Sequence, residues 1–191
     1  GVLAIKDLRA AGVAPEALLS LMARLGSSQP VELRMSLDEL ADGFELSQFG
    51  ASPTKFDAED LWPLTREANQ ARPLAEVADR IAALGVPADQ AERFWRVASQ
   101  NITKLDDLGG WWEIFSNGAE PQVDPEDVDF IAQAMTLLPP PPYTDTSWAE
   151  FTNAVKAATG RKGKGLFMPL RKALTGQAHG PDMSDVMPLL Q

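Results

Sequence analysis

Several residue types and patterns are scarce in this chain, and each shortage excludes a class of site or protein. Its 191 residues contain no cysteine, which excludes disulfides, thiolate metal sites and a cysteine nucleophile. The single histidine, His179, excludes a histidine-based zinc cluster. No apolar run approaches the roughly 20 residues that cross a bilayer, and the first residues lack the features of a signal peptide. We therefore expect a cytoplasmic protein without membrane contact. The missing initial methionine is typical of a piece of a longer protein.

The chain also lacks strand patterns. No segment alternates with period two over β-branched residues, whereas helix signals recur at short intervals. In the first half, Pro15 begins a helix, Ser36 and Glu39 form a capping box, and Pro63 starts a new helix after a break near Trp62. We therefore predict an all-α fold of helical bundle subdomains.

The second half continues the helical pattern. Helices are predicted at residues 73–84 and 88–100, and Thr103 with Asp106 should cap a third that runs to Phe115. The adjacent Trp111 and Trp112 cannot share one buried face, so one of the two should point away from the core.

Residues from Pro125 onward predict three more helices and a boundary. The helix at Pro125 should direct four apolar side chains inward: Val128, Ile131, Met135 and Leu138. Four prolines, residues 139–142, then stop the helix and form a stiff spacer, which is the clearest boundary in the chain. Beyond it, Ser147 with Glu150 should cap a helix, and another should begin at Pro169.

The charge is unevenly distributed. A net charge of −10 and a pI near 4.5 argue against nucleic acid, because phosphate binding needs lysine and arginine. Residues 151–181, however, hold six basic side chains and no acidic one. At a Debye length of about 8 Å, the local field matters more than the distant total. A polyanion could therefore dock on this segment.

The string GRKGKGLFMPLRKALTG, residues 160–176, is the best candidate for that contact. Its glycines can expose backbone N–H groups that bind phosphate beside a helix N-terminus near Pro169, and an aromatic ring can stack on an unpaired base. The candidate RNA contacts are Arg161, Lys162, Lys164, Phe167, Arg171 and Lys172. The alternative is a solvated basic loop before an amphipathic helix that buries Phe167, Leu170 and Leu174; composition alone favours this alternative.

No catalytic or metal-binding residue is predicted. His179 lies beside a glycine and a proline without a nucleophile or a second histidine, which indicates a turn residue. The acidic residues within 57–60 and 124–129 lie at helix starts, where the helix dipole favours negative charge. We therefore interpret them as caps.

Three strings together resemble the region that follows the catalytic domain in bacterial glutamyl-tRNA synthetases. The opening GVLAIKDLRAAGVAPEALLSLMARLG looks like the segment after that family's KMSKS-type ATP loop. SLDELADGFELSQFGASPTKFDAEDL is similar to a family pattern that contains S-P-A-K-F-D, with Thr54 in place of alanine. TGRKGKGLFMPLRKALTGQAHGPDM resembles the K-G-K-x-L-F-M-P-L-R-x-A-L-T-G signature. The matches cover about 60 residues at the start of the sequence and about 40 at its end.

The resemblance implies that different parts of the chain contact different parts of a tRNA. It implies a stem-contact helical domain at 1–72 and two anticodon-binding helical subdomains at 73–138 and 143–191. The family attaches glutamate to tRNA using ATP and magnesium, through HIGH and KMSKS motifs that these residues lack. The resemblance therefore implies a tRNA-binding part, expected to be monomeric, with no cofactor of its own and no activity alone.

Some alternatives stay open at this point. The anticodon-reading arginine of the middle subdomain is Arg80, Arg93 or Arg96. A helical protein interaction module would instead use the acidic middle of the chain to bind a basic partner. A divergent synthetase paralogue would keep the scaffold and act on another substrate.

Overall fold

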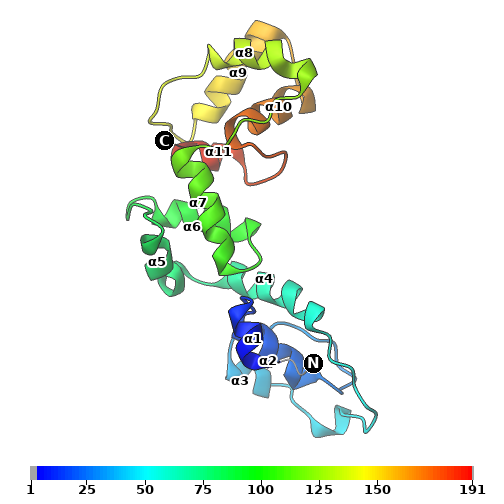
Figure 1. Cartoon of the computed structure of the whole chain (residues 1–191). Helices are drawn as coiled ribbons and strands as arrows, with labels where there is room; N and C mark the ends of the chain where they lie inside the picture. Colours follow the sequence, from blue (N-terminus) through cyan, green and yellow to red (C-terminus); the bar gives the residue numbers. More distant parts are fainter. Residues whose placement is uncertain (1–3, 191) are drawn as a thin grey trace. The chain divides into compact units, whose positions relative to one another are not determined.

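The structure, a computed structural model, describes residues 4–190, and its regular elements there are helices and 3₁₀ turns (Figure 1). A single antiparallel bridge joins Ser27 and Phe49, and the described residues form no strand. The all-α prediction is confirmed. Within the same range, no helix is both long and apolar enough to cross a membrane.

The chain divides into two compact units. Unit 1 contains the described residues up to Val77 together with Ile102–Asp107, and unit 2 contains Ala78–Asn101 and the described residues from Leu108 onward. The domain boundaries expected from the sequence, 1–72, 73–138 and 143–191, stay predictions.

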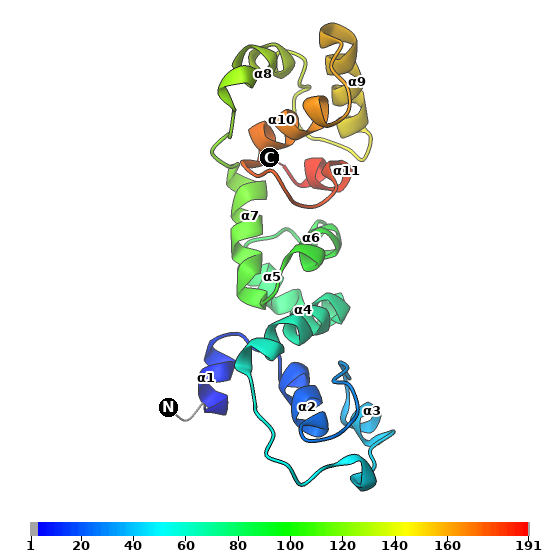
Figure 2. The ribbon, with the colours of Figure 1, turned by 90° about the vertical axis from the view of Figure 1, so that its right-hand side faces the viewer.

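In unit 1, helix α2 packs against helix α4 (Figure 2). The helices of this unit are α1 (Ile5–Ala10), α2 (Pro15–Arg24), α3 (Leu37–Ala41), α4 (Leu61–Ala71) and the start of α5 (Leu74–Ala83). Short 3₁₀ turns occur at Leu46–Gln48, Ala58–Asp60 and Leu105–Asp107. The buried core consists of Leu8, Val13, Ala14, Ala17, Leu21, Leu61, Leu64 and Ala68.

The predicted helix starts in unit 1 are confirmed. Pro15 is the first residue of α2. The Ser36 hydroxyl accepts from the Glu39 N–H (3.2 Å), and the Glu39 carboxylate accepts from the Met35 N–H (2.8 Å), one residue earlier than an ideal capping box. Helix α3 therefore has a cap formed by its own sequence.

The break near Trp62 lies just before α4. Asp57 caps the 3₁₀ turn Ala58–Asp60, and α4 then begins at Leu61. Pro63 is the third residue of α4, where the missing N–H has no cost because the N–H groups of a first turn have no intrahelical acceptor. The prediction that Pro63 starts this helix is therefore right to within two residues.

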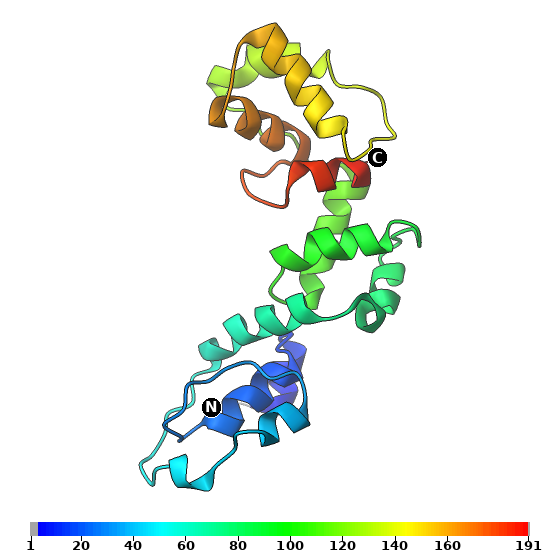
Figure 3. The same cartoon turned by 180° about the vertical axis from the view of Figure 1, so that it is seen from behind.

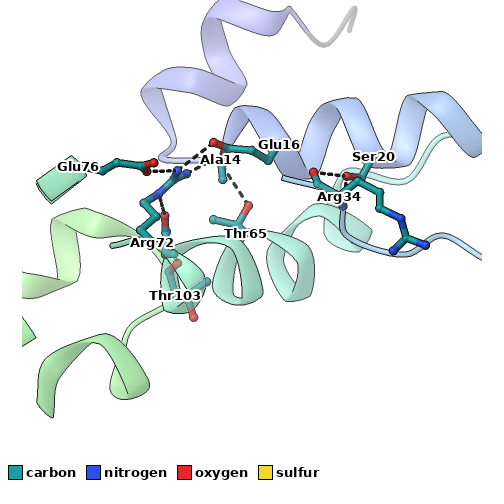
Figure 4. Close-up of polar contacts among 9 residues, drawn as sticks. Ala14, Glu16, Ser20, Arg34, Thr65, Arg72, Glu76 and Thr103 are labelled. Atoms are coloured by element: carbon teal, nitrogen blue, oxygen red, sulfur yellow. Dashed lines mark hydrogen bonds and ion pairs between the residues drawn. The ribbon is translucent and has the colours of Figure 1, made fainter. Parts of the chain in front are cut away.

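Arg72 joins three helices of unit 1 (Figure 4). Its guanidinium donates to both Glu16 carboxylate oxygens (2.9 and 2.8 Å), to Asn69 Oδ1 (2.9 Å) and to the Glu76 carboxylate (3.3 Å). The hydrogen bond to Arg72 lowers the pKa of Glu16, and the same bond raises the pKa of Arg72. This arginine therefore holds the end of α4 and the start of α5 against α2.

Unit 2 contains the rest of α5 and the helices that follow it. They are α6 (Ala91–Ala98), α7 (Leu108–Asn117), α8 (Val128–Met135), α9 (Ser147–Thr159), α10 (Lys164–Thr175) and α11 (Met183–Val186), with 3₁₀ turns at Ser99–Asn101, Pro125–Asp127 and Met187–Leu189. The Phe94 ring meets Trp112 and Phe115 edge-on at centroid distances of 5.5 and 6.1 Å, which packs α6 on α7. Trp112 is buried and Trp111 is half-buried, so the expectation that one of the pair points away from the core is confirmed.

Helices α8, α9 and α10 share a second core in unit 2 (Figure 3). Its buried residues are Phe130, Ile131, Ala134, Phe151, Val155, Leu166, Leu170 and Ala173. Because α8 precedes the four prolines and α9 follows them, the proline run connects two helices of one packing group.

The predicted inward position of Val128 is wrong. Its side chain is 52% exposed, whereas Ile131 is buried as predicted. The buried stripe runs through Phe130, Ile131 and Ala134, and its helical spacing extends back to Asp127 instead of Val128. Asp127 occupies that inward position because it pairs with an arginine described below.

Two predicted caps use other residues. Thr103 with Asp106 does not form the predicted cap: Thr103 and Lys104 donate their N–H groups to the Asp107 carboxylate (3.0 and 3.1 Å), and the Thr103 hydroxyl accepts from Arg66 (3.4 Å). A 3₁₀ turn at Leu105–Asp107 displaces the start of α7 and makes Asp107 the acceptor.

Helix α9 begins at Ser147 as predicted, with different hydrogen bonds. The Ser147 hydroxyl accepts from the Thr144 N–H (2.8 Å), and the Glu150 carboxylate accepts from the Thr146 hydroxyl (3.1 Å). The cap therefore fixes the turn before the helix.

Candidate functional site

Helix α10 begins at Lys164, so the prediction that it begins at Pro169 is wrong. Pro169 lies inside the helix and has no N–H, which leaves the Gly165 carbonyl, four residues earlier, without its usual intrahelical donor. Arg161 Nη1 donates to that carbonyl at 3.2 Å. Gly163, at φ +60°, takes the left-handed turn that brings the chain into the helix. An arginine outside the helix thus replaces the bond that the proline removes.

The same guanidinium makes two further contacts. Arg161 Nη1 lies 2.6 Å from Asp127 Oδ1, and the guanidinium carbon lies 3.9 Å from the centroid of the Phe130 ring. A cation held over an aromatic face and paired with a carboxylate is stabilised by both contacts. Arg161 is therefore engaged inside the fold.

Lys172 is engaged near the other end of α10. Its Nζ lies 2.7 Å from Asp124 Oδ2, and its side chain is only 15% exposed. Helix α10 ends at Gly176, at φ +69°, where an added Cβ would lie 2.7 Å from the Glu120 carbonyl oxygen. Both ends of this side of α10 are thus tied to residues 120–127.

The acidic cluster before α8 is part of this pairing. The carboxylates of Asp124, Glu126 and Asp127 lie within 4.8 Å of one another. Asp124 and Asp127 are the N-cap residues of the 3₁₀ turn Pro125–Asp127 and of α8, as predicted, although neither side chain accepts a capping hydrogen bond. Arg161 and Lys172 neutralise two of the three charges, which explains why the cluster is tolerated.

Another face of α10 lines a hollow of about 290 Å³. Lys164, Phe167 and Arg171 follow one another at intervals of three and four residues, which places them on one helical face. The residues that line the hollow are Trp148, Lys164, Phe167, Met168, Arg171, Asp182 and Met183. The Phe167 side chain is 45% exposed, and its ring lies 6.4 Å from the Trp148 ring. The hollow thus combines two cations with an accessible aromatic surface.

Arg171 differs from Arg161 in its surroundings. It is half-buried, and among the described residues its guanidinium has no hydrogen bond and no ion pair. Burial lowers the pKa of Arg171, while the charge of Asp182 acts in the opposite direction. A Cβ added to Gly180 would lie 3.2 Å from Arg171 Nη1 and 3.3 Å from the Trp111 ring, so these three residues pack closely. The Arg171 guanidinium is therefore held in place without a hydrogen-bond acceptor from residues 4–190.

The six predicted contacts separate into groups. Lys164, Phe167 and Arg171 meet at the hollow, and Lys162 is exposed in the loop before α10. Arg161, which precedes α10, and Lys172, on a different face of the helix, do not line the hollow and pair with aspartates. Whether any of the six contacts RNA stays a prediction.

Sequence reasoning missed four residues of the hollow: Trp148, Met168, Asp182 and Met183. Asp182 accepts from the Ser184 N–H (2.8 Å) and caps α11, and an aspartate two residues before a serine is a recognisable signal of this turn. Trp148 gave no such signal, because its helical spacing is equally typical of a core residue.

The arginines proposed for the middle of the chain lie within unit 2. Arg93 Nη1 lies 2.7 Å from Asp145 and 4.0 Å from Asp185, and Arg96 Nη2 lies 3.4 Å from Asp185. Both arginines bind carboxylates of their own unit. The choice among Arg80, Arg93 and Arg96 stays open.

Comparison with known proteins connects this geometry to a family. Residues 113–191 match the family model described as "Anticodon binding domain". Over all 191 residues, the chain is 86% identical to glutamate–tRNA ligase 1 of Paracoccus denitrificans and 74% identical to glutamate–tRNA ligase 2 of Cereibacter sphaeroides. The chain spans about 43% of the length of each of these relatives.

A solved structure supports the fold. A glutamate–tRNA ligase from Elizabethkingia meningosepticum, crystallised with its amino acid, superimposes with a TM-score of 0.73 at 20% identity, covering 96% of this chain and 40% of that chain. The sequence matches extend over all of this chain, and the anticodon-binding match begins within α7 and continues through α11, so the chain is similar along its whole length to somewhat less than half of a glutamate–tRNA ligase.

Proposed function

We propose that this chain binds tRNA and that the hollow beside α10 contacts the anticodon loop. The observation that carries the proposal is Arg171, a half-buried guanidinium with no hydrogen bond or ion pair among the described residues, on one face with Lys164 and Phe167. The Arg171 donors are not fully buried, and the residue lines the hollow, so they can bind an external acceptor that enters it. Phosphates and base edges of unpaired RNA supply such acceptors.

Each residue of this face has a distinct task in the proposal. Arg171 offers a rigid fork of N–H donors that fits a phosphate or a base edge. Lys164, the first residue of α10, places a mobile charge beside a helix N-terminus, where phosphates bind favourably. Phe167 offers an exposed ring on which a base can stack. Lys162, in the loop before the helix, adds attraction to the RNA backbone.

The longer protein would attach glutamate to tRNA. Its relatives are glutamate–tRNA ligases, and ATP and magnesium would act in the part of the relatives that lies outside this chain. In this proposal the chain supplies RNA contacts to a cytoplasmic enzyme, is monomeric, and does not aminoacylate by itself.

Binding to a tRNA that accepts glutamate, followed by fluorescence anisotropy, tests this function against a generic RNA duplex of equal length. We expect tighter binding to the tRNA, and affinity that falls steeply with salt. Arg171→Ala and Lys162→Ala should each weaken binding while the circular dichroism melt stays unchanged. Equal affinity for the two RNAs, or unchanged affinity in both variants, would count against the function.

A further inference from the structure

We propose that Arg161 is a positioning residue for the RNA-binding face of α10 and does not itself contact RNA. This inference rests on the proposed function, because it concerns which cations of the tail face the RNA. In the sequence alone, Arg161 is indistinguishable from Lys162 and Lys164 as a phosphate ligand. The structure separates these three cations.

The first argument is that the helix needs Arg161. Pro169 removes the donor for the Gly165 carbonyl, and Arg161 Nη1 supplies a replacement at 3.2 Å. A carbonyl in the first turns of a helix that loses its donor must otherwise be satisfied by water, or the helix bends. Arg161 thereby stabilises the turns of α10 that carry Lys164 and Phe167.

The second argument is that the guanidinium is already occupied. It forms an ion pair with Asp127 at 2.6 Å and lies over the Phe130 ring at 3.9 Å. The Asp127 side chain is only 13% exposed, so removing Arg161 would leave a largely buried carboxylate without a partner. An RNA phosphate would have to compete with both contacts.

The third argument is the face of α10 that each cation serves. Helical spacing places Lys164, Phe167 and Arg171 along one face, whereas Gly165 and Lys172, seven residues apart, lie along another. Arg161 reaches Gly165 on this second face, and Lys172 pairs there with Asp124. The two arginines of the tail thus serve different faces of one helix.

Asp127→Asn gives the sharpest test, because the two roles predict opposite signs. If Arg161 contacted phosphate, releasing it from Asp127 would tighten tRNA binding and steepen the dependence of log K on log salt. In the positioning role, tRNA affinity falls about threefold or more and the salt slope stays unchanged. Tighter binding with a steeper slope would overturn the inference.

Arg161→Gln and Lys164→Gln form a matched pair, since each removes one positive charge from the same segment. Lys164→Gln should reduce the magnitude of the salt slope by about 0.7 to 0.9, the contribution of one phosphate contact. Arg161→Gln should weaken binding while leaving the slope as it is. A slope change of equal size in both variants would assign Arg161 to the RNA.

A measurement without RNA separates failure of this inference from failure of the proposed function. In a Pro169→Ala background, residue 169 regains an N–H that can bond to the Gly165 carbonyl. Arg161→Gln should therefore lower the melting temperature less in that background than in the native chain. Equal losses in both backgrounds would overturn the positioning role, whereas absence of tRNA binding by the native chain would overturn only the function.

Discussion

Unit 1 and unit 2 each contain a half-buried arginine, and the two differ in whether the described residues supply hydrogen-bond acceptors for the guanidinium. Arg72 in unit 1 donates to Glu16, Asn69 and Glu76, and its pKa is raised. Arg171 in unit 2 has no hydrogen-bond acceptor among the described residues, and burial lowers its pKa. A satisfied guanidinium stabilises the fold, whereas an unsatisfied one has donors left for a ligand.

The largest expected effect on stability belongs to Arg72→Met. Removing the guanidinium leaves the Glu16 carboxylate poorly solvated and releases α5 from α2, which should cost about 2–3 kcal/mol of the free energy of unfolding. Urea denaturation followed by circular dichroism measures this loss, and the salt slope of tRNA binding should not change. A loss below about 0.5 kcal/mol would show that the contacts in Figure 4 contribute little to the fold.

Arg171→Met should weaken tRNA binding and leave the stability of the fold nearly unchanged, the reverse of Arg72→Met. Because the native guanidinium is desolvated without a partner, we expect the free energy of unfolding to stay within about 0.5 kcal/mol of the native value. Affinity for tRNA should fall about 10- to 50-fold, which corresponds to about 1.4–2.3 kcal/mol. Anisotropy and urea titrations on the same samples check both values. Lost stability with retained tRNA affinity would show that Arg171, like Arg72, stabilises the fold and does not contact RNA.

Phe167→Ala sharpens the comparison on the face of α10. An exposed ring that stacks on a base contributes about 1–3 kcal/mol to binding. We expect the low end of that range, about a fivefold loss of tRNA affinity, because the Trp148 ring beside Phe167 remains. Val128→Ala is the control, since Val128 is comparably exposed on α8 and outside the hollow, and it should leave affinity unchanged.

The smallest expected effect is a pH dependence in unit 1. The pKa of Glu16 is lowered in the folded state, so its contribution to stability is present above the ordinary value and is lost as pH falls through the lowered one. Glu16→Gln should therefore be less stable than the native chain at pH 7, by no more than about 1 kcal/mol after solvent screening. The difference should shrink as the pH of the melts falls through the lowered pKa of Glu16, and a constant difference would contradict the origin assigned to it.

Local sequence signals predicted much of the fold. Pro15 and Ser36 mark helix starts through their own backbone and side-chain chemistry, and both do so in the structure. The helix start predicted at Pro169 was wrong. A proline can lie inside a helix when a donor from elsewhere in the chain, here Arg161, bonds to the carbonyl four residues before it. The prediction for Val128 was wrong because Asp127, interpreted only as a cap, takes the inward position and pairs with Arg161.

The sequence predicted which segment of the chain carries the candidate site, but not which of its side chains share one surface. The sequence indicated that residues 160–176 carry the cations, but side-chain direction depends on tertiary pairing with Asp124 and Asp127. Trp148 and Asp182 join the hollow from other helices, which no local pattern indicates. Spacing along α10 would have separated the two groups of cations had the helix start been placed at Lys164.

The central claim, that one face of α10 contacts the anticodon loop, is tested most directly by nuclear magnetic resonance. An anticodon stem-loop RNA would be titrated into the ¹⁵N-labelled chain. The account predicts that the signals of Lys164, Phe167 and Arg171 shift early and strongly, while the side-chain signals of Arg161 stay in place. Shifts confined to residues 120–127 and Arg161, or absent from α10, would contradict it.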